Sequence, residues 1–125
     1  MLTTTLQVAL GGAIGAALRF LAAAAMLRVA PPAFPVAILS VNVLGSFLMG
    51  VFVIWSQQRG LAHLNPFVMT GILGGFTTFS AFSLDTFALV ERGQIGLAAA
   101  YVVASIALSV GALFAGVALA RGALA

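Results

Sequence analysis

Four long apolar segments dominate the pattern of the chain. They cover roughly residues 6–27, 36–56, 66–90 and 95–120, and each holds about 20 residues or more. A helix of about 20 residues crosses a hydrocarbon core of about 30 Å. The stretches between the segments are too short to be domains. We therefore predict an all-α integral membrane protein in which residues 1–125 form one domain of four transmembrane helices.

The joints between the segments are polar or break helices. The first joint contains Pro31, Pro32 and Pro35, which a continuing helix does not tolerate. No charge precedes Arg19, so the apolar start lacks the basic region of a signal peptide. We expect the first segment to be retained as a permanent helix.

The third segment contains a run that is unusual for a membrane helix. Residues 71–83 read GILGGFTTFSAFS, in which three glycines precede Thr77 and Thr78. Glycine costs about 1 kcal/mol against alanine in a helix, and β-branched residues lose side-chain freedom there. The run therefore predicts that the third helix is broken. It has two interpretations: a glycine kink with aromatic packing, or the kind of broken helix that marks a transport site.

Composition narrows the class of protein. The chain is 63% hydrophobic and only 6% charged, whereas soluble domains carry about 25% charged residues. It has no cysteine, one loop histidine (His63) and only two carboxylates (Asp85 and Glu91). This inventory offers no nucleophile–base pair and no thiolate metal site, so we do not expect an enzyme. The arginines are scattered, which argues against nucleic-acid binding.

The loop charges bear on how the chain inserts into the bilayer. Arg59 and Arg121 fall on one side of the membrane, and Arg28 and Arg92 fall on the other. Orientation follows the Lys/Arg bias of short loops, and here that bias is close to zero. We expect insertion in both orientations, which permits an antiparallel dimer. The alternative is that one orientation dominates.

Small and polar residues recur at helical spacing. Gly11, Gly15 and Arg19 share a face of the first segment, where small residues let helices approach closely. Asn42 and Ser46 share a face of the second. Arg19 either faces protein and water or extends to the headgroups, and the Asn42 amide either bonds a neighbouring helix or faces an ion.

Four polar groups are expected at one depth in the membrane, namely Arg19, Asn42, Asp85 and Tyr101. An ion pair between Arg19 and Asp85 would neutralise both charges. The fourth segment adds hydroxyls at four-residue spacing, which form a line about 12 Å long; these are Tyr101, Ser105 and Ser109. Intramembrane polar residues cluster along pathways, which favours a wetted track over isolated serines.

The available groups suit a small anion. Hydroxyls and the Asn42 amide donate hydrogen bonds, and the edges of Phe79 and Phe82 carry the positive part of the ring quadrupole. Composition does not distinguish fluoride from chloride.

Three motifs carry a resemblance to a known family. They are GGAIGAALR at residues 11–19, VNVLGSF at 41–47 and GGFTTFSAFS at 74–83. Together they resemble the signatures of the CrcB/Fluc fluoride channels in the right order along the chain. The resemblance implies a dual-topology, antiparallel homodimer with two fluoride pores in the bacterial inner (plasma) membrane. Such a multi-pass channel exports fluoride passively and relieves its toxicity.

The resemblance also assigns roles to residues. Arg19 would lie in the vestibule, and the backbone carbonyls of Gly74 and Thr77 from both subunits would hold a structural sodium ion at the dimer interface. Ala81 and Asp85 depart from the threonine and glutamate common in the family, which leaves the role of Asp85 open. The implied pore residues are Asn42, Thr78, Phe79, Ser80, Phe82, Tyr101, Ser105 and Ser109.

Two other functions fit a four-helix membrane protein. A small multidrug or cation exporter of dual topology needs a membrane-embedded glutamate in the first segment, and this chain has none there. A non-transporting assembly subunit would use its polar groups only for helix packing.

Overall fold

Four membrane-length helical stretches make up the fold. The computed structural model describes residues 1–30 and 33–124; Pro31 and Pro32 of the first joint lie outside this part. The stretches with the length and hydropathy of membrane spans are Leu2–Val29, Val36–Gln58, Ala62–Glu91 and Ile95–Ala123. This confirms the predicted all-helical membrane architecture. The first span begins about one turn earlier than predicted, because Thr5 and its neighbours continue the helix to Leu2.

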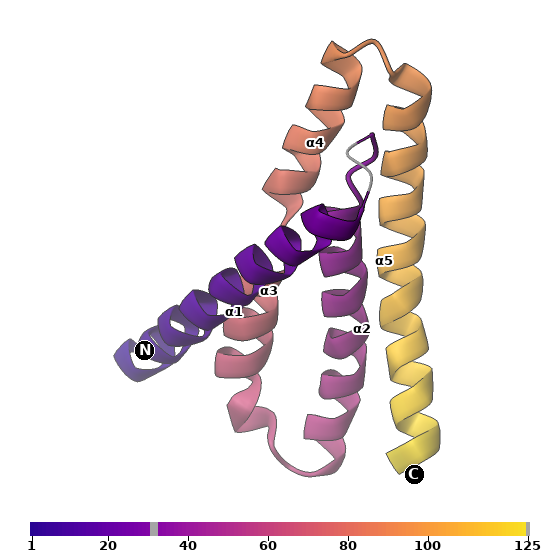
Figure 1. Cartoon of the computed structure of the whole chain (residues 1–125). Helices are drawn as coiled ribbons and strands as arrows, with labels where there is room; N and C mark the ends of the chain where they lie inside the picture. The colour runs from indigo at the N-terminus through magenta and orange to yellow at the C-terminus, as the bar shows by residue number, and fades with distance from the viewer. Residues whose placement is uncertain (31–32, 125) are drawn as a thin grey trace.

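The first, second and fourth spans are continuous α-helices. They are α1 (Leu2–Val29), α2 (Val36–Gln58) and α5 (Ile95–Leu124). Figure 1 shows α2 and α5 side by side, while α1 runs obliquely across the molecule and away from them. The oblique course leaves much of α1 outside the bundle.

The third span is built from pieces. A 3-10 turn, η1 (Ala62–Leu64), leads into a π-helix, η2 (Pro66–Leu73), and then into the single turn α3 (Gly74–Phe76). After an interruption the chain resumes as α4 (Phe79–Glu91).

The interruption lies at the two threonines. Thr77 has φ −87° and ψ 156°, and Thr78 has φ −152° and ψ 122°, so both residues are extended. The predicted break in the third helix is therefore confirmed. It begins directly after the glycines and phenylalanine of α3, where helix propensity is lowest.

Glycines allow the third span to lie against the backbone of α1. A Cβ added to Gly11 would meet the Phe67 carbonyl, and one added to Gly15 would meet the Ile72 carbonyl. From the opposite side, Gly71 faces Gly11 and Gly75 faces the backbone of Gly12. The close approach predicted from the small residues of the first segment is confirmed, and its partner is the segment that precedes the break.

A second glycine contact joins α2 to α5. Gly50 lies against the Leu113 carbonyl, and Gly116 lies against the Phe47 carbonyl. These contacts bring two backbones together along adjacent faces, as small residues do in membrane helix pairs. The pair forms a straight support beside the broken span (Figure 1).

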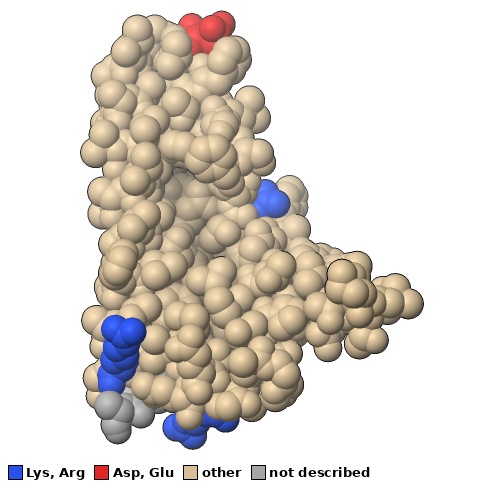
Figure 2. Space-filling view, turned by 180° about the vertical axis from the view of Figure 1, so that it is seen from behind, with Lys and Arg blue, Asp and Glu red and all other residues tan. Residues whose placement is uncertain are grey.

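A small buried cluster joins α4 to α5 beyond the break. It consists of Phe82, Leu89, Ala98 and Tyr101, with Phe34 from the turn before α2 packed against it. Elsewhere many large apolar side chains are exposed, including Leu6, Leu10 and Phe20 of α1. Figure 2 shows a face of the molecule that is mostly uncharged, with an acidic patch at the top, a basic patch at mid-height and basic patches near the bottom. Such a surface suits lipid or another apolar protein surface, because exposed apolar groups are stable in either.

The contact of α1 with the third span predicts a difference between two glycines of α1, Gly12 and Gly15. Gly15→Ala should lower the stability of the purified protein by about 1–3 kcal/mol, because its new methyl group would overlap the Ile72 carbonyl. Gly12→Ala is the matched control, since a Cβ at Gly12 meets nothing within 4 Å. The midpoint of thermal unfolding, followed by fluorescence of the single tryptophan Trp55, tests the difference. Equal midpoints for the two variants would contradict the close contact.

Candidate functional site

One side chain bonds both backbone groups of Thr78 at the break. The Asn42 amide, on α2, donates from Nδ2 to the carbonyl oxygen of Thr78 at 3.0 Å. The backbone N–H of Thr78 donates in turn to Oδ1 of Asn42 at 2.8 Å. Asn42 therefore bonds the neighbouring span, as one of the two sequence interpretations expected. Its amide nitrogen carries a second hydrogen, which leaves it able to serve another acceptor.

The threonines of the break stabilise the two helix ends that flank it. Thr77 Oγ1 donates to the Leu73 carbonyl oxygen at 2.9 Å. Thr78 is the N-cap of α4, where its Oγ1 accepts from the N–H of Ala81 at 3.1 Å. Threonine is a favoured N-cap because its oxygen serves an otherwise unpaired helix N–H. Two adjacent hydroxyl residues thus end one helix and begin the next.

Arg19 lies on the opposite side of the break. Its Nε donates to the carbonyl oxygen of Gly75 at 3.1 Å. A cation is favourable at this point because the last carbonyls of a helix carry partial negative charge. Asp85 has a different partner, Tyr101, whose hydroxyl donates to Asp85 Oδ2 at 3.1 Å. The structure does not join Arg19 to Asp85, the ion pair that the sequence left open.

A cleft of about 240 Å³ lies beside the break. It brings together residues from α2, from the break and α4, and from α5. Of the eight residues predicted for a pore, six line this cleft: Asn42, Thr78, Phe79, Phe82, Ser105 and Ser109. Ser46 and Thr77 also line it. The resemblance did not assign Ser46, but its spacing of four residues from Asn42 is the signal that places it on this face.

The other two predicted pore residues lie outside the cleft wall. Ser80 is exposed on α4, with its Oγ 3.2 Å from that of Thr78. Tyr101 is fully buried, and its ring lies 5.2 Å from the ring of Phe82. Of the hydroxyl line on α5, the cleft therefore contains Ser105 and Ser109, while Tyr101 stands behind Phe82.

Ser105 is the least satisfied polar group in the cleft. The residue is 7% exposed, and its Oγ has no hydrogen-bond partner among the described residues. A buried hydroxyl without a partner costs about 1–3 kcal/mol, so it normally has one. A hydrogen-bond acceptor in the cleft would satisfy Ser105.

The two phenylalanines differ in burial. Their ring centroids are 5.4 Å apart with planes at 52°, yet Phe82 is 9% exposed and Phe79 is 78% exposed. The cleft is therefore walled on the side of Phe82 and open on the side of Phe79. A single chain does not enclose it.

Side chains do not form a metal centre in the described part of the chain. Within residues 1–30 and 33–124, no three His, Cys, Asp or Glu residues come together. A hard cation would depend on oxygen ligands from the backbone. None of the side-chain hydrogen bonds in the described part of the chain uses the carbonyl oxygens of Gly74 or Thr77. These are the oxygens that the resemblance assigns to sodium.

Comparison with known proteins places the chain in a family. Residues 6–117 match the family described as "CrcB-like protein, Camphor Resistance (CrcB)". The chain belongs to the CrcB family. The match covers all three motifs and both sides of the cleft of this CrcB-family chain.

Curated relatives of this CrcB-family chain share most of its sequence. A protein of Roseobacter denitrificans is 61% identical over 117 residues, which cover 92% of this chain and 93% of the relative. A protein of Ruegeria sp. is 58% identical over 125 residues, covering 99% of each chain. Each of the two carries the name "Fluoride-specific ion channel FluC". The resemblance found in the sequence is thereby confirmed, and the chain falls in a family of channels rather than of enzymes.

The pairing of Asn42 with Thr78 predicts how the break responds to substitution. Asn42→Ala leaves the N–H and C=O of the half-buried Thr78 without their partner, at up to about 1–3 kcal/mol for each group. Amide hydrogen exchange read by mass spectrometry should therefore become faster at residues 76–81. Ser46→Ala is the control, because Ser46 lines the same cleft one turn along α2. Exchange that increased equally in the two variants would show that Asn42 does not hold the break.

Proposed function

We propose that this CrcB-family chain forms a fluoride channel that exports fluoride passively from the bacterial cell. The observation that carries the proposal is the cleft beside the broken helix, in which hydroxyl, amide and aromatic groups surround the unpartnered Ser105. The names of its relatives supply the ion. A multi-pass membrane location follows from the four spans, and the bacterial relatives support the inner membrane.

The lining of the cleft suits an anion that must lose water. Removing an ion from water is costly unless new hydrogen bonds replace those of the hydration shell. Ser105 and Ser109 supply hydroxyl donors on α5, and Asn42 has a second amide hydrogen. Phe79 and Phe82 can present positive ring edges from the opposite wall. A small anion that accepts strong hydrogen bonds benefits most from this set.

The functional unit is an antiparallel homodimer with two pores. Two features support it: the arginines are balanced across the membrane, and the cleft is open beside the exposed Phe79. A second copy in the opposite orientation would close this side. Each copy would then contribute one cleft, with Asn42, Phe79 and Phe82 as pore residues and Arg19 in the vestibule. Thr78, Ser80, Tyr101, Ser105 and Ser109 complete the proposed pore set.

A structural sodium ion at the dimer interface completes the proposed assembly. The Thr77 ψ of 156° turns the chain out of the helix, so its carbonyl leaves the helical hydrogen-bond ladder. Carbonyl oxygens released in this way are suitable ligands for a hard cation. Gly74 and Thr77 from both copies would hold the ion, which would neutralise converging carbonyl dipoles and lock the two breaks together.

Fluoride efflux from liposomes tests the proposed function. Liposomes loaded with fluoride should release it passively, as read by a fluoride electrode, with chloride far slower. Phe79→Ile or Phe82→Ile should reduce the flux about fivefold or more, because each removes a ring edge worth about 1 kcal/mol or more to the ion. Phe87→Ile on α4 is the matched control, since Phe87 is 59% exposed and lies outside the cleft.

The same assay separates the alternatives. Flux without preference for fluoride over chloride would end the proposal. A proton-driven exporter would instead move organic cations and respond to a pH gradient, and an assembly subunit would conduct nothing. Unchanged flux in both phenylalanine variants would remove those rings from the pore.

The sodium site predicts a dependence on the cation present during purification. Exchange of Na⁺ for N-methyl-D-glucamine should slow fluoride efflux and lower the thermal stability of the dimer. Restoring Na⁺ should reverse both changes, whereas a return to ionic strength alone should not. Dimers that kept full flux and stability after complete exchange would show that sodium has no structural role.

A further inference from the structure

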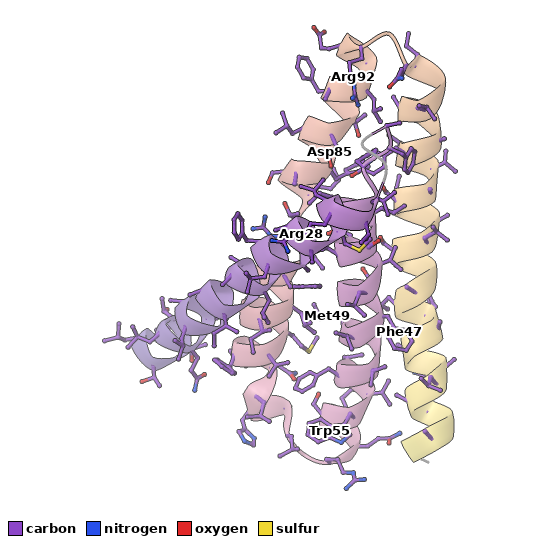
Figure 3. The ribbon with its side chains drawn as sticks, viewed as in Figure 1. Arg28, Phe47, Met49, Trp55, Asp85 and Arg92 are labelled. Atoms are coloured by element: carbon purple, nitrogen blue, oxygen red, sulfur yellow. The ribbon has the colours of Figure 1, made fainter. Side chains whose placement is uncertain are left out.

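A second cavity lies on the other side of Tyr101 from the cleft. It has a volume of about 320 Å³ and lies between the end of α1, the turn before α2, and α4. Most of its wall is apolar, with Ala23, Leu27 and Phe34 among the lining residues. Two charged residues, Asp85 of α4 and Arg92 directly after it, also line it. Figure 3 shows that Arg92 lies beyond Asp85 toward the end of α4.

Tyr101 stands between the two cavities. On one side its ring lies 5.2 Å from that of Phe82, which lines the cleft. On the other side it meets Phe34, which lines the second cavity, edge-on at 5.6 Å and 89°. Tyr101 is fully buried by these contacts. Its single hydroxyl hydrogen goes to Asp85 Oδ2, which belongs to the second cavity.

We propose that Asp85 is a positioning residue that fixes the hydroxyl of Tyr101 on the side of the second cavity and so restrains the passage of fluoride between the two cavities. The inference rests on the proposed fluoride pathway. A phenol has one hydrogen to donate, and a carboxylate accepts it more strongly than a neutral oxygen does. An anion that leaves the cleft past Tyr101 must therefore compete with Asp85 for this donor.

Both charged residues of the second cavity would act on an anion. Asp85 places a negative charge on the proposed path of an anion, and Arg92, directly after the end of α4, places a positive one in the same wall. The carboxylate of Asp85 would also repel fluoride electrostatically, and this effect has to be separated from its hydrogen bond with Tyr101. Removing the Tyr101 hydroxyl separates the two, because the repulsion remains and the hydrogen bond is lost.

A double-mutant cycle measures the competition. Asp85→Asn should raise the single-channel fluoride current roughly fivefold, the difference between a charge-assisted and a neutral hydrogen bond. In a Tyr101→Phe background the same substitution should change the current by less than about twofold. Asp85→Glu, which keeps the carboxylate, should bring the current back toward that of the parent protein. An equal increase with and without the tyrosine hydroxyl would assign the effect to repulsion and overturn the proposal.

The phenol itself gives a second readout. Tyr101 is the only tyrosine of the chain, so a ring-¹³C tyrosine label reports on this residue alone. The infrared C–O stretch of the phenol should shift in Asp85→Asn and return in Asp85→Glu. Fluoride should then shift the band at a concentration several-fold lower in Asp85→Asn than in the parent protein. A C–O band that shifted neither on substitution of Asp85 nor on addition of fluoride would overturn the proposal.

The two measurements keep this inference distinct from the proposed function. A parent protein that conducts no fluoride overturns both. A parent protein that conducts fluoride, with equal effects of Asp85→Asn in the two backgrounds, retains the channel and rejects only the restraint by Asp85.

Discussion

The pair of hydrogen bonds between the Asn42 amide and the backbone of Thr78 is the interaction on which the rest of the site depends. Extended backbone inside a membrane has N–H and C=O groups without helical partners, and lipid tails cannot hydrogen-bond to them. Asn42 pairs with both groups of Thr78 from the neighbouring helix, so the chain can leave one helix and start another. The cleft follows from this, because the restarted helix places Phe79 and Phe82 opposite the serines of α5.

The glycine contacts provide the second requirement, which is a fixed position for the broken span. Gly11 and Gly15 of α1 lie directly against the backbone of η2, and Arg19 follows them with a bond to Gly75. One face of α1 thus contacts the backbone of the third span. Arg19 on the same helix donates a hydrogen bond to the carbonyl oxygen of Gly75, just before the break. The break is therefore held from two sides. Backbone contacts with α1 fix the segment before it, and the Asn42 amide of α2 hydrogen-bonds to Thr78 within it.

Sequence patterns predicted the break but not its partners. Four apolar runs fix four spans, and the glycines followed by Thr77 and Thr78 fix where the third span fails, because both effects are local. Spacing alone does not fix the rotation of a helix about its axis, so it left Arg19 free to pair with Asp85. The structure pairs Arg19 with Gly75 and Asp85 with Tyr101. The π-helical turns of η2, which lie against α1, were not predicted from the sequence.

The exposure of Phe79 has a consequence for a single chain in a bilayer. Because Phe79 is 78% exposed, one side of the cleft is open, and in a bilayer this side would face hydrocarbon tails. Hydrocarbon tails are apolar and do not solvate an anion. A continuous path for an ion therefore needs another surface that covers the cleft on the side of Phe79.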